Sequence, residues 1–134
     1  MATGFLSKDA FTAAAGKLPV ERVELPEMGG HVYVRGMSGV ERDTWERSLV
    51  VGKGKRRDYN LDNVRARLAA RTICDEAGVR TFTDADADAL GTIRVDCLNR
   101  IFEVAQRLSG VSDQDLDDLG KGSELEAGSG SSTN

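Results

Sequence analysis

The chain has 134 residues and a formal net charge of −4, and 40% of its residues are hydrophobic. This length fits one globular domain with its own core, and because no long apolar run or secretory leader pattern is visible, we expect a cytoplasmic protein without a membrane partner. Residues 58–134 carry a charge of −7 against +3 for residues 1–57, and only seven residues are aromatic. A nucleic-acid partner is therefore not expected.

Residues 1–18 are predicted to form an N-terminal arm. In it Ser7 can cap a short, weak helix that Gly16 and Pro19 end, and the alternative is a mobile arm. Over about residues 20–36 the pattern changes to the alternation of a β-hairpin, with PEMGG as its turn. A lone hairpin is only marginally stable, so we expect it to pack on helices or to pair with another chain through its free edge.

The next predicted element is a helix that Ser38 opens, because Glu41 three residues later completes a capping box. Trp45 and Leu49 give this helix an apolar stripe, and we expect it to end near Val51. These two apolar residues are candidates for partner binding, although such a pair more often belongs to a core.

A basic loop, broken by glycines, is expected at residues 52–58. Within its KGKRR cluster, Arg56 and Arg57 are further candidates for partner binding. A solvated loop without a binding function is the simpler interpretation of the same residues.

Asn60 or a residue just before it can cap a longer helix that runs to about Ala77 and stops at Gly78. Its apolar residues are expected to face the core and its arginines to face solvent. The core-facing residues are Leu61, Val64, Leu68 and Ile73, and the outward residues are Arg65, Arg67 and Arg71.

The stretch TFTDADADALG, residues 81–91, has aspartates at alternate positions, as a calcium-binding loop does at its start. Such a loop also needs a glycine at its sixth position and a glutamate at its twelfth, where this chain has Ala89 and Val95. A helix start capped by Thr83 explains the aspartates better, because negative charge is favourable in the first turns of a helix. The three aspartates are Asp84, Asp86 and Asp88.

The strongest helical pattern covers about residues 92–109, and Gly110 ends it. Ser112 then caps a last acidic helix, DQDLDDLG. Residues 121–134 have the Gly and Ser content of a flexible tail. The apolar face of the 92–109 helix consists of Leu98, Ile101, Phe102, Ala105 and Leu108.

No sequence motif indicates catalysis. The four Gly-Lys pairs lack the upstream glycine of a phosphate-binding loop, and the single histidine, His31, is expected at a solvated position after the hairpin turn. Cys74 and Cys97 lie in apolar helical patterns and are expected to be two buried thiols rather than zinc ligands. We therefore predict no enzyme activity, no cofactor and no metal site.

Three longer stretches share an order and spacing with one known family. They are PEMGGHVYVRGMSGVERD at residues 26–43, ARTICDEAGVRTFTDADADALG at residues 70–91 and LNRIFEVAQRLSGVS at residues 98–112. They resemble the tail assembly chaperones of long-tailed, siphovirus-type bacteriophages, and the resemblance covers about residues 19–120. The matching motifs are the helix start Met37–Arg42, the turn Cys74–Gly78, the Phe-Thr-Asp of Phe82–Asp84 and the helix end Phe102–Gly110.

The resemblance implies a non-enzymatic function in the cytoplasm of a host bacterium. Proteins of that family bind and solubilise the tape measure protein, help to recruit subunits of the tail tube (major tail) protein, and are left out of the mature virion. The implied partners also include further copies of the chain and a longer form of it made by a programmed frameshift. Leu119, Gly120 and Lys121 are a possible frameshift site, because their codons can contain a slippery run.

The expected fold is α+β and mainly α, with an N-terminal β-hairpin followed by about four helices and a disordered C-terminal tail. In this interpretation, residues 1–18 are the arm, residues 19–120 are a tail assembly chaperone-like domain, and residues 121–134 are the tail. The alternative function is that of a structural head-tail connector or minor tail protein that stays in the virion.

Overall fold

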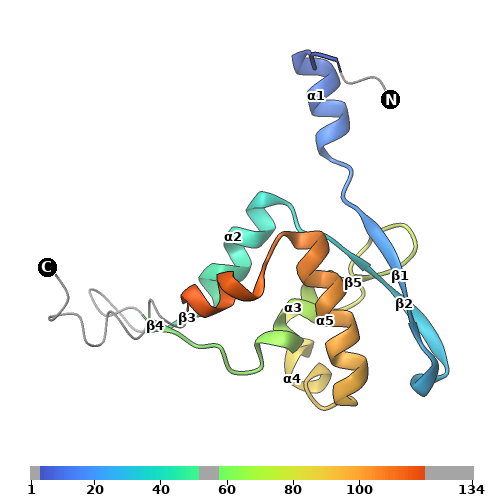
Figure 1. Ribbon diagram of the computed structural model, residues 1–134, viewed down its shortest axis with the longest axis vertical. Helices are drawn as coiled ribbons and strands as arrows, with labels where there is room; N and C mark the ends of the chain where they lie inside the picture. The colour runs from blue at the N-terminus through green and yellow to red at the C-terminus, as the bar shows by residue number, and fades with distance from the viewer. Residues whose placement is uncertain (1–3, 52–57, 120–134) are drawn as a thin grey trace, which may run out of the picture.

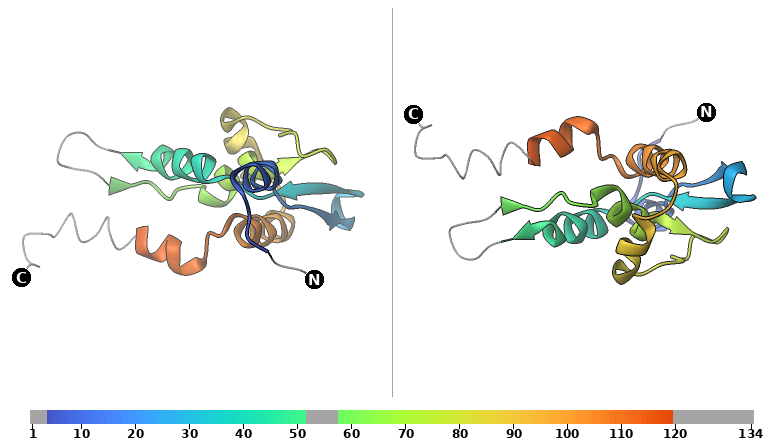
Figure 2. Two further views of the ribbon diagram at one scale, coloured as in Figure 1. Left: turned by 90° about the horizontal axis from the view of Figure 1, so that it is seen from above. Right: turned by 90° about the horizontal axis from the view of Figure 1, so that it is seen from below.

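The computed structural model describes residues 4–51 and 58–119, and it confirms the mainly α, α+β fold. A three-stranded antiparallel sheet in the order β1 (Val20–Leu25), β2 (Gly30–Arg35) and β5 (Ile73–Cys74) packs against helices α3 (Val64–Thr72) and α5 (Val95–Ser109), and we call this sheet with its helices the body (Figure 1). A second, two-stranded sheet joins β3 (Val50–Val51) to β4 (Asp58–Tyr59), and Figure 2 shows it at the end of the molecule opposite the β1-β2 hairpin. The predicted tail at residues 121–134 lies outside the described residues.

The predicted hairpin is confirmed. Strand β1 (Val20–Leu25) pairs with strand β2 (Gly30–Arg35) along its whole length. The turn is a short 3-10 helix, η1 (Pro26–Met28), which Gly29 closes with a φ of 83°. Glycine adopts this left-handed conformation without a steric penalty, which explains the double glycine of the turn.

Helix α2 (Gly39–Ser48) begins with the predicted capping box. The Ser38 hydroxyl accepts a hydrogen bond from the Glu41 amide at 3.2 Å, and the Glu41 carboxylate accepts one from the Ser38 amide at 2.9 Å. The helix ends earlier than expected because Val50–Val51 form strand β3, which pairs with β4 (Asp58–Tyr59). Two consecutive β-branched valines favour a strand over the last turn of a helix.

Helix α3 (Val64–Thr72) is shorter at both ends than the predicted 60–77 helix. At its start the Asn60 side chain accepts a hydrogen bond from the Asp62 amide at 2.9 Å, which forms a turn rather than a helix cap. At its end the chain becomes strand β5 (Ile73–Cys74), which pairs with β2. Cys74 therefore lies in a strand, whereas its pattern indicated a helix.

Gly78 was expected to end a helix, and this expectation is wrong. It lies in a turn, with a φ of 88°. The carboxylate of Asp75 organises this turn, since it accepts hydrogen bonds from the amides of Ala77 and Val79, each at 2.9 Å. The turn returns the chain to the sheet, where Arg80 forms a bridge with Cys74.

The aspartate-rich stretch starts a helix, as expected. Thr83 and Asp86 form a capping box, after which the chain passes through a 3-10 turn, η2 (Asp84–Asp86), into the short helix α4 (Ala87–Leu90). Helix α5 (Val95–Ser109) follows and ends at Gly110, whose φ is 70°. Residues 113–119 are helical as well, and the Ser112 hydroxyl accepts a hydrogen bond from the Asp115 amide at 3.0 Å.

The core lies between the sheet and helices α3 and α5, which pack against each other and against β2. Leu98, Ile101 and Ala105 of α5 are buried there, while Phe102 and Leu108 of the same predicted face are half-buried. Among the described residues, no helix combines the length and the hydropathy that crossing a membrane requires.

Candidate partner-binding surface

Two of the four residues that the sequence nominated for partner binding are buried. Trp45 and Leu49 are 1% and 0% exposed, so both belong to the core, which was the alternative interpretation of this pair. A partner could reach them only by unfolding the body. Arg56 and Arg57 lie outside the described residues.

The possible frameshift site begins at Leu119, the last residue that the structure describes. Leu119 is half-buried and packs against the core. Gly120 and Lys121 lie outside the described residues.

The Met37–Arg42 motif of the family resemblance joins the sheet to α2. Arg35, at the end of β2, is only 8% exposed and donates two hydrogen bonds to the Glu41 carboxylate, at 2.6 and 3.3 Å. Burial opposes the ionisation of this carboxyl, but hydrogen bonds from Arg35 and Ser38 outweigh it and hold the pKa of Glu41 below its ordinary value. The role of Glu41 is thus structural.

The same motif also contacts the Phe102–Gly110 motif. Arg42 donates a hydrogen bond to the carbonyl of Gly110 at 3.2 Å and reaches the Asp115 carboxylate at 3.5 Å. Gly36 lies so close to α5 that a Cβ atom there would come within 2.5 Å of the carbonyl oxygen of Leu108. These contacts fix the exit of the hairpin against the end of α5.

Arg71 was expected to face solvent, and this expectation is wrong. It is 9% exposed, and its guanidinium donates a hydrogen bond to Asp84 Oδ2 at 2.6 Å. Arg80 donates to the other oxygen of Asp84 at 3.1 Å and also to the carbonyl of Ala70. The arginine turns inward because Asp84, 13 residues later in the chain, provides a partner for it.

Two ion pairs connect α5 to the hairpin. Arg107 pairs with Glu21 at 2.8 Å, and Arg100 pairs with Glu27 at 2.9 Å. The hydrogen bond from Arg100 lowers the pKa of Glu27 to about 2.

The groups considered for catalysis are dispersed. His31 is exposed, with its ring 5.5 Å from that of Tyr33 in an edge-on arrangement. Cys74 and Cys97 are free and buried, as expected, and burial raises the pKa of both thiols. Within residues 4–51 and 58–119, no three acidic, histidine or cysteine side chains gather in a way that could hold a metal ion.

The N-terminal segment carries three exposed apolar side chains, and the sequence did not nominate it as a site. Helix α1 (Lys8–Ala15) is capped by Ser7, as predicted, and buries none of its residues. Figure 1 shows that it stands clear of the body. Phe5, Leu6 and Phe11 are 97%, 53% and 59% exposed, and we refer to these three side chains as the apolar arm.

Two residues of the apolar arm have the spacing of a hydrophobic staple, a local motif at helix starts. Leu6 precedes the cap and Phe11 occupies the fourth helical position, the two positions that contact each other in a hydrophobic staple. The sequence signal for the arm was the presence of two of the four phenylalanines among the first eleven residues.

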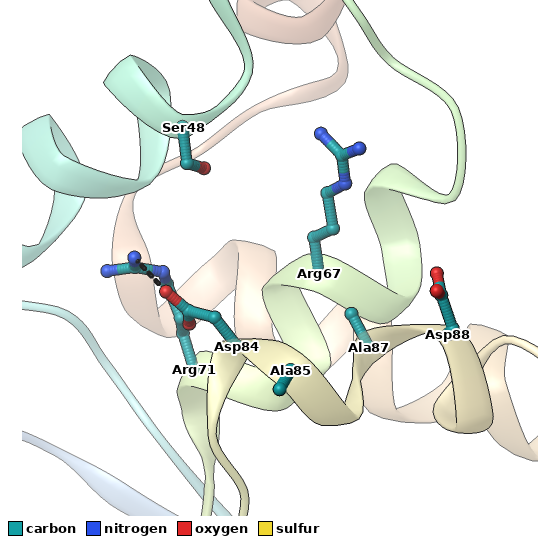
Figure 3. A pocket seen from close by; sticks show the side chains of 7 residues that line it. All are labelled: Ser48, Arg67, Arg71, Asp84, Ala85, Ala87 and Asp88. Carbon is teal, nitrogen blue, oxygen red and sulfur yellow. Dashed lines mark hydrogen bonds and ion pairs between the residues drawn. The ribbon is translucent and has the colours of Figure 1, made fainter.

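A cavity of about 280 Å³ lies between α2, α3 and the start of α4. Arg67 and Arg71 of α3 line it together with Asp84, and Figure 3 shows the Arg67 side chain across the cavity from the Arg71–Asp84 pair. Like Arg71, Arg67 was expected to face solvent, but it is half-buried and turns toward this cavity. The other lining residues are Ser48, Ala85, Ala87 and Asp88.

A scan against protein-family models and searches among curated proteins and solved structures gave no match to this chain.

Proposed function

We propose that the chain is a tail assembly chaperone of a long-tailed bacteriophage. In this role it binds the tape measure protein in the host cytoplasm and keeps it soluble until tail tube subunits assemble around it. The observation that supports the proposal most is the apolar arm on a helix that buries none of its own residues.

An exposed apolar helix of this kind favours a partner for two physical reasons. A helix of eight residues is marginal in water on its own, so contact with another molecule would stabilise it. Apolar surface gains about 25 cal/mol for each Å² that is removed from water. Both terms favour an arm that covers an apolar segment of another chain.

The size of the arm suits reversible binding. An aromatic side chain buries roughly 150–250 Å², so three side chains provide less than the roughly 800 Å² that each partner buries in a stable interface. One arm alone would therefore bind weakly, and several copies on one long tape measure protein would bind tightly through their effective concentration. Amphipathic helices of the tape measure protein are the expected contact, since their apolar residues recur on one face.

The residues that carry the family resemblance support the proposal as well, and they lie in the body rather than in the arm. They hold the hairpin exit, the Asp75 turn and the end of α5 in place. The same resemblance extends the proposal to the tail tube protein, to further copies of the chain and to a longer frameshifted form. The codons for residues 119–121 test the last point, since the frameshift at this site requires a slippery heptamer there.

Co-expression with the tape measure protein of the same phage tests the function. We expect the wild-type chain to keep the tape measure protein in the soluble fraction, and the double variant Phe5→Ser, Phe11→Ser to lose most of this effect. The matched control is Val40→Ser, Val95→Ser, which removes two body residues that are 75% and 62% exposed and should behave as wild type.

Two results would contradict the proposal. If the tape measure protein pellets equally with and without the chain, there is no chaperone function. Stoichiometric amounts of the chain in purified virions would favour the head-tail connector instead.

A further inference from the structure

We propose that the cavity between Arg67 and Arg71 binds a single carboxylate, which an acidic side chain of a partner protein supplies. We call it the arginine cavity. The inference is independent of the apolar arm and does not require the partner to be the tape measure protein.

The charge around Asp84 is unbalanced, because two arginines pair with its carboxylate. Its Oδ2 atom lies 2.6 Å from Arg71, and its Oδ1 atom lies 3.1 Å from Arg80. One carboxylate thus serves two guanidinium groups, and Arg71 is only 9% exposed. With Arg67 and Asp88, which line the same cavity, three guanidinium groups face two carboxylates, so one further anion would balance the charge.

Arg67 adds a further positive charge to the lining of the cavity. It lies four residues before Arg71 on α3, so both side chains project from the same side of the helix. Its guanidinium donates to the carbonyl of Asn60 at 3.3 Å, and no ion pair joins it to a carboxylate of residues 4–50 or 60–119. An anion between Arg67 and Arg71 would relieve the repulsion of their like charges.

The lining of the cavity favours a carboxylate over a phosphate. Asp84 and Asp88 also line the cavity, so a doubly charged phosphate would be repelled more strongly than a carboxylate with one charge. The planar guanidinium groups match the two oxygens of a carboxylate. Ala85 and Ala87 add apolar surface for the methylene groups of a side chain.

The volume fits the same ligand. About 280 Å³ lies below the range of roughly 300–1,000 Å³ that is typical of sites for small molecules and cofactors. The cavity has room for a glutamate or aspartate side chain that enters from the surface of a partner.

Nuclear magnetic resonance of the arginine Nε–Hε groups tests the proposal on the whole chain. The probes are sodium propionate, sodium phosphate, a capped alanine-based peptide with one central glutamate, and its glutamine twin, all at one ionic strength set with sodium chloride. We expect propionate and the glutamate peptide to shift the Arg67 and Arg71 signals saturably, the peptide at the lower concentration. The glutamine twin should leave the signals unchanged.

Two variants test whether Arg67 binds the carboxylate. Arg67→Gln should weaken propionate binding at least tenfold, while Arg94→Gln, which removes an exposed arginine paired with Asp96, should bind as wild type does. Circular dichroism checks that each variant folds. If Arg67→Gln does not fold, Arg67→Lys keeps the charge without the planar fork and should still weaken binding.

The proposal is overturned if the shifts do not exceed those with chloride, if phosphate binds more tightly than propionate, or if folded Arg67 variants bind as wild type does. Binding of propionate but not of the glutamate peptide would overturn the partner side chain as the source of the carboxylate.

Discussion

The carboxylate of Glu41 joins the sheet to the first helix of the body. It receives two hydrogen bonds from Arg35, whose side chain is 10% exposed, and one from the amide of Ser38. A buried guanidinium that loses its carboxylate remains desolvated and unpaired, so the loss of one partner is more costly than the pair is stabilising.

Glu41→Gln should therefore lower the free energy of unfolding by about 2 kcal/mol at neutral pH. The folded pKa of Glu41 lies below its ordinary value of 4.5, so the contribution is complete above that value and is lost as the pH falls through the folded pKa. Urea denaturation at several pH values should show the gap between wild type and variant narrowing below pH 4.5. The exposed Glu76→Gln is the control, and an equal effect of both changes would contradict the structural role of Glu41.

A second prediction at this scale concerns Glu27, whose pKa of about 2 results chiefly from the hydrogen bond of Arg100. In Arg100→Gln the pKa of Glu27 should rise toward its ordinary value of 4.5, whereas Arg65→Gln should leave it unchanged. Carbon-13 titration of the glutamate carboxyl measures both. A pKa of Glu27 that stays near 2 without Arg100 would contradict the assigned cause.

At the scale of elements, helices with a local start signal could be predicted from the sequence. Ser7, Ser38, Thr83 and Ser112 each stand at the expected helix start, because a cap depends on residues three or four positions away. Strand β5 could not be predicted, since its two residues become a strand only by pairing with β2, about 40 positions earlier.

The candidate sites follow the same rule. The inward turn of Arg71 depends on Asp84, which the sequence places in another element. The spacing of Trp45 and Leu49 is the same for a pair that faces the core and for a pair that faces a partner. Only the packing of the body shows that both residues belong to the core. The apolar arm could have been found from its phenylalanines, but their exposure depends on where the rest of the chain packs.

Gly36 and Gly39 look alike in the sequence RGMSG, yet the structure separates them. A Cβ at Gly36 would meet the Leu108 backbone, whereas at Gly39 nothing lies within 4 Å. Gly36→Ala should lower the free energy of unfolding by about 3 kcal/mol because α5 must move away from the hairpin. Gly39→Ala should be neutral or stabilise the protein by up to about 1 kcal/mol. Thermal denaturation compares the melting temperatures of the two variants, and equal shifts would contradict the close packing at Gly36.

In the whole molecule, the apolar arm and the body differ in how they are packed. The body is held together by its core and by the contacts of Arg35, Arg42 and Arg71. None of the three side chains of the arm is buried. In the proposed function, stability and partner binding are therefore separable.

This separation predicts that Phe5→Ser, Phe11→Ser leaves the free energy of unfolding within about 0.5 kcal/mol of wild type. Urea denaturation measures it. A loss of several kcal/mol would mean that the arm packs on the body.

The most direct test of the central claim is amide hydrogen exchange of the chain alone and in its complex with the tape measure protein. The account predicts that the amides of residues 8–15 exchange rapidly in the free chain and become protected in the complex. The body should change little, apart from the residues around Arg67 if the same partner fills the arginine cavity. A stable complex in which residues 8–15 remain unprotected would contradict the assignment of α1 as the binding element.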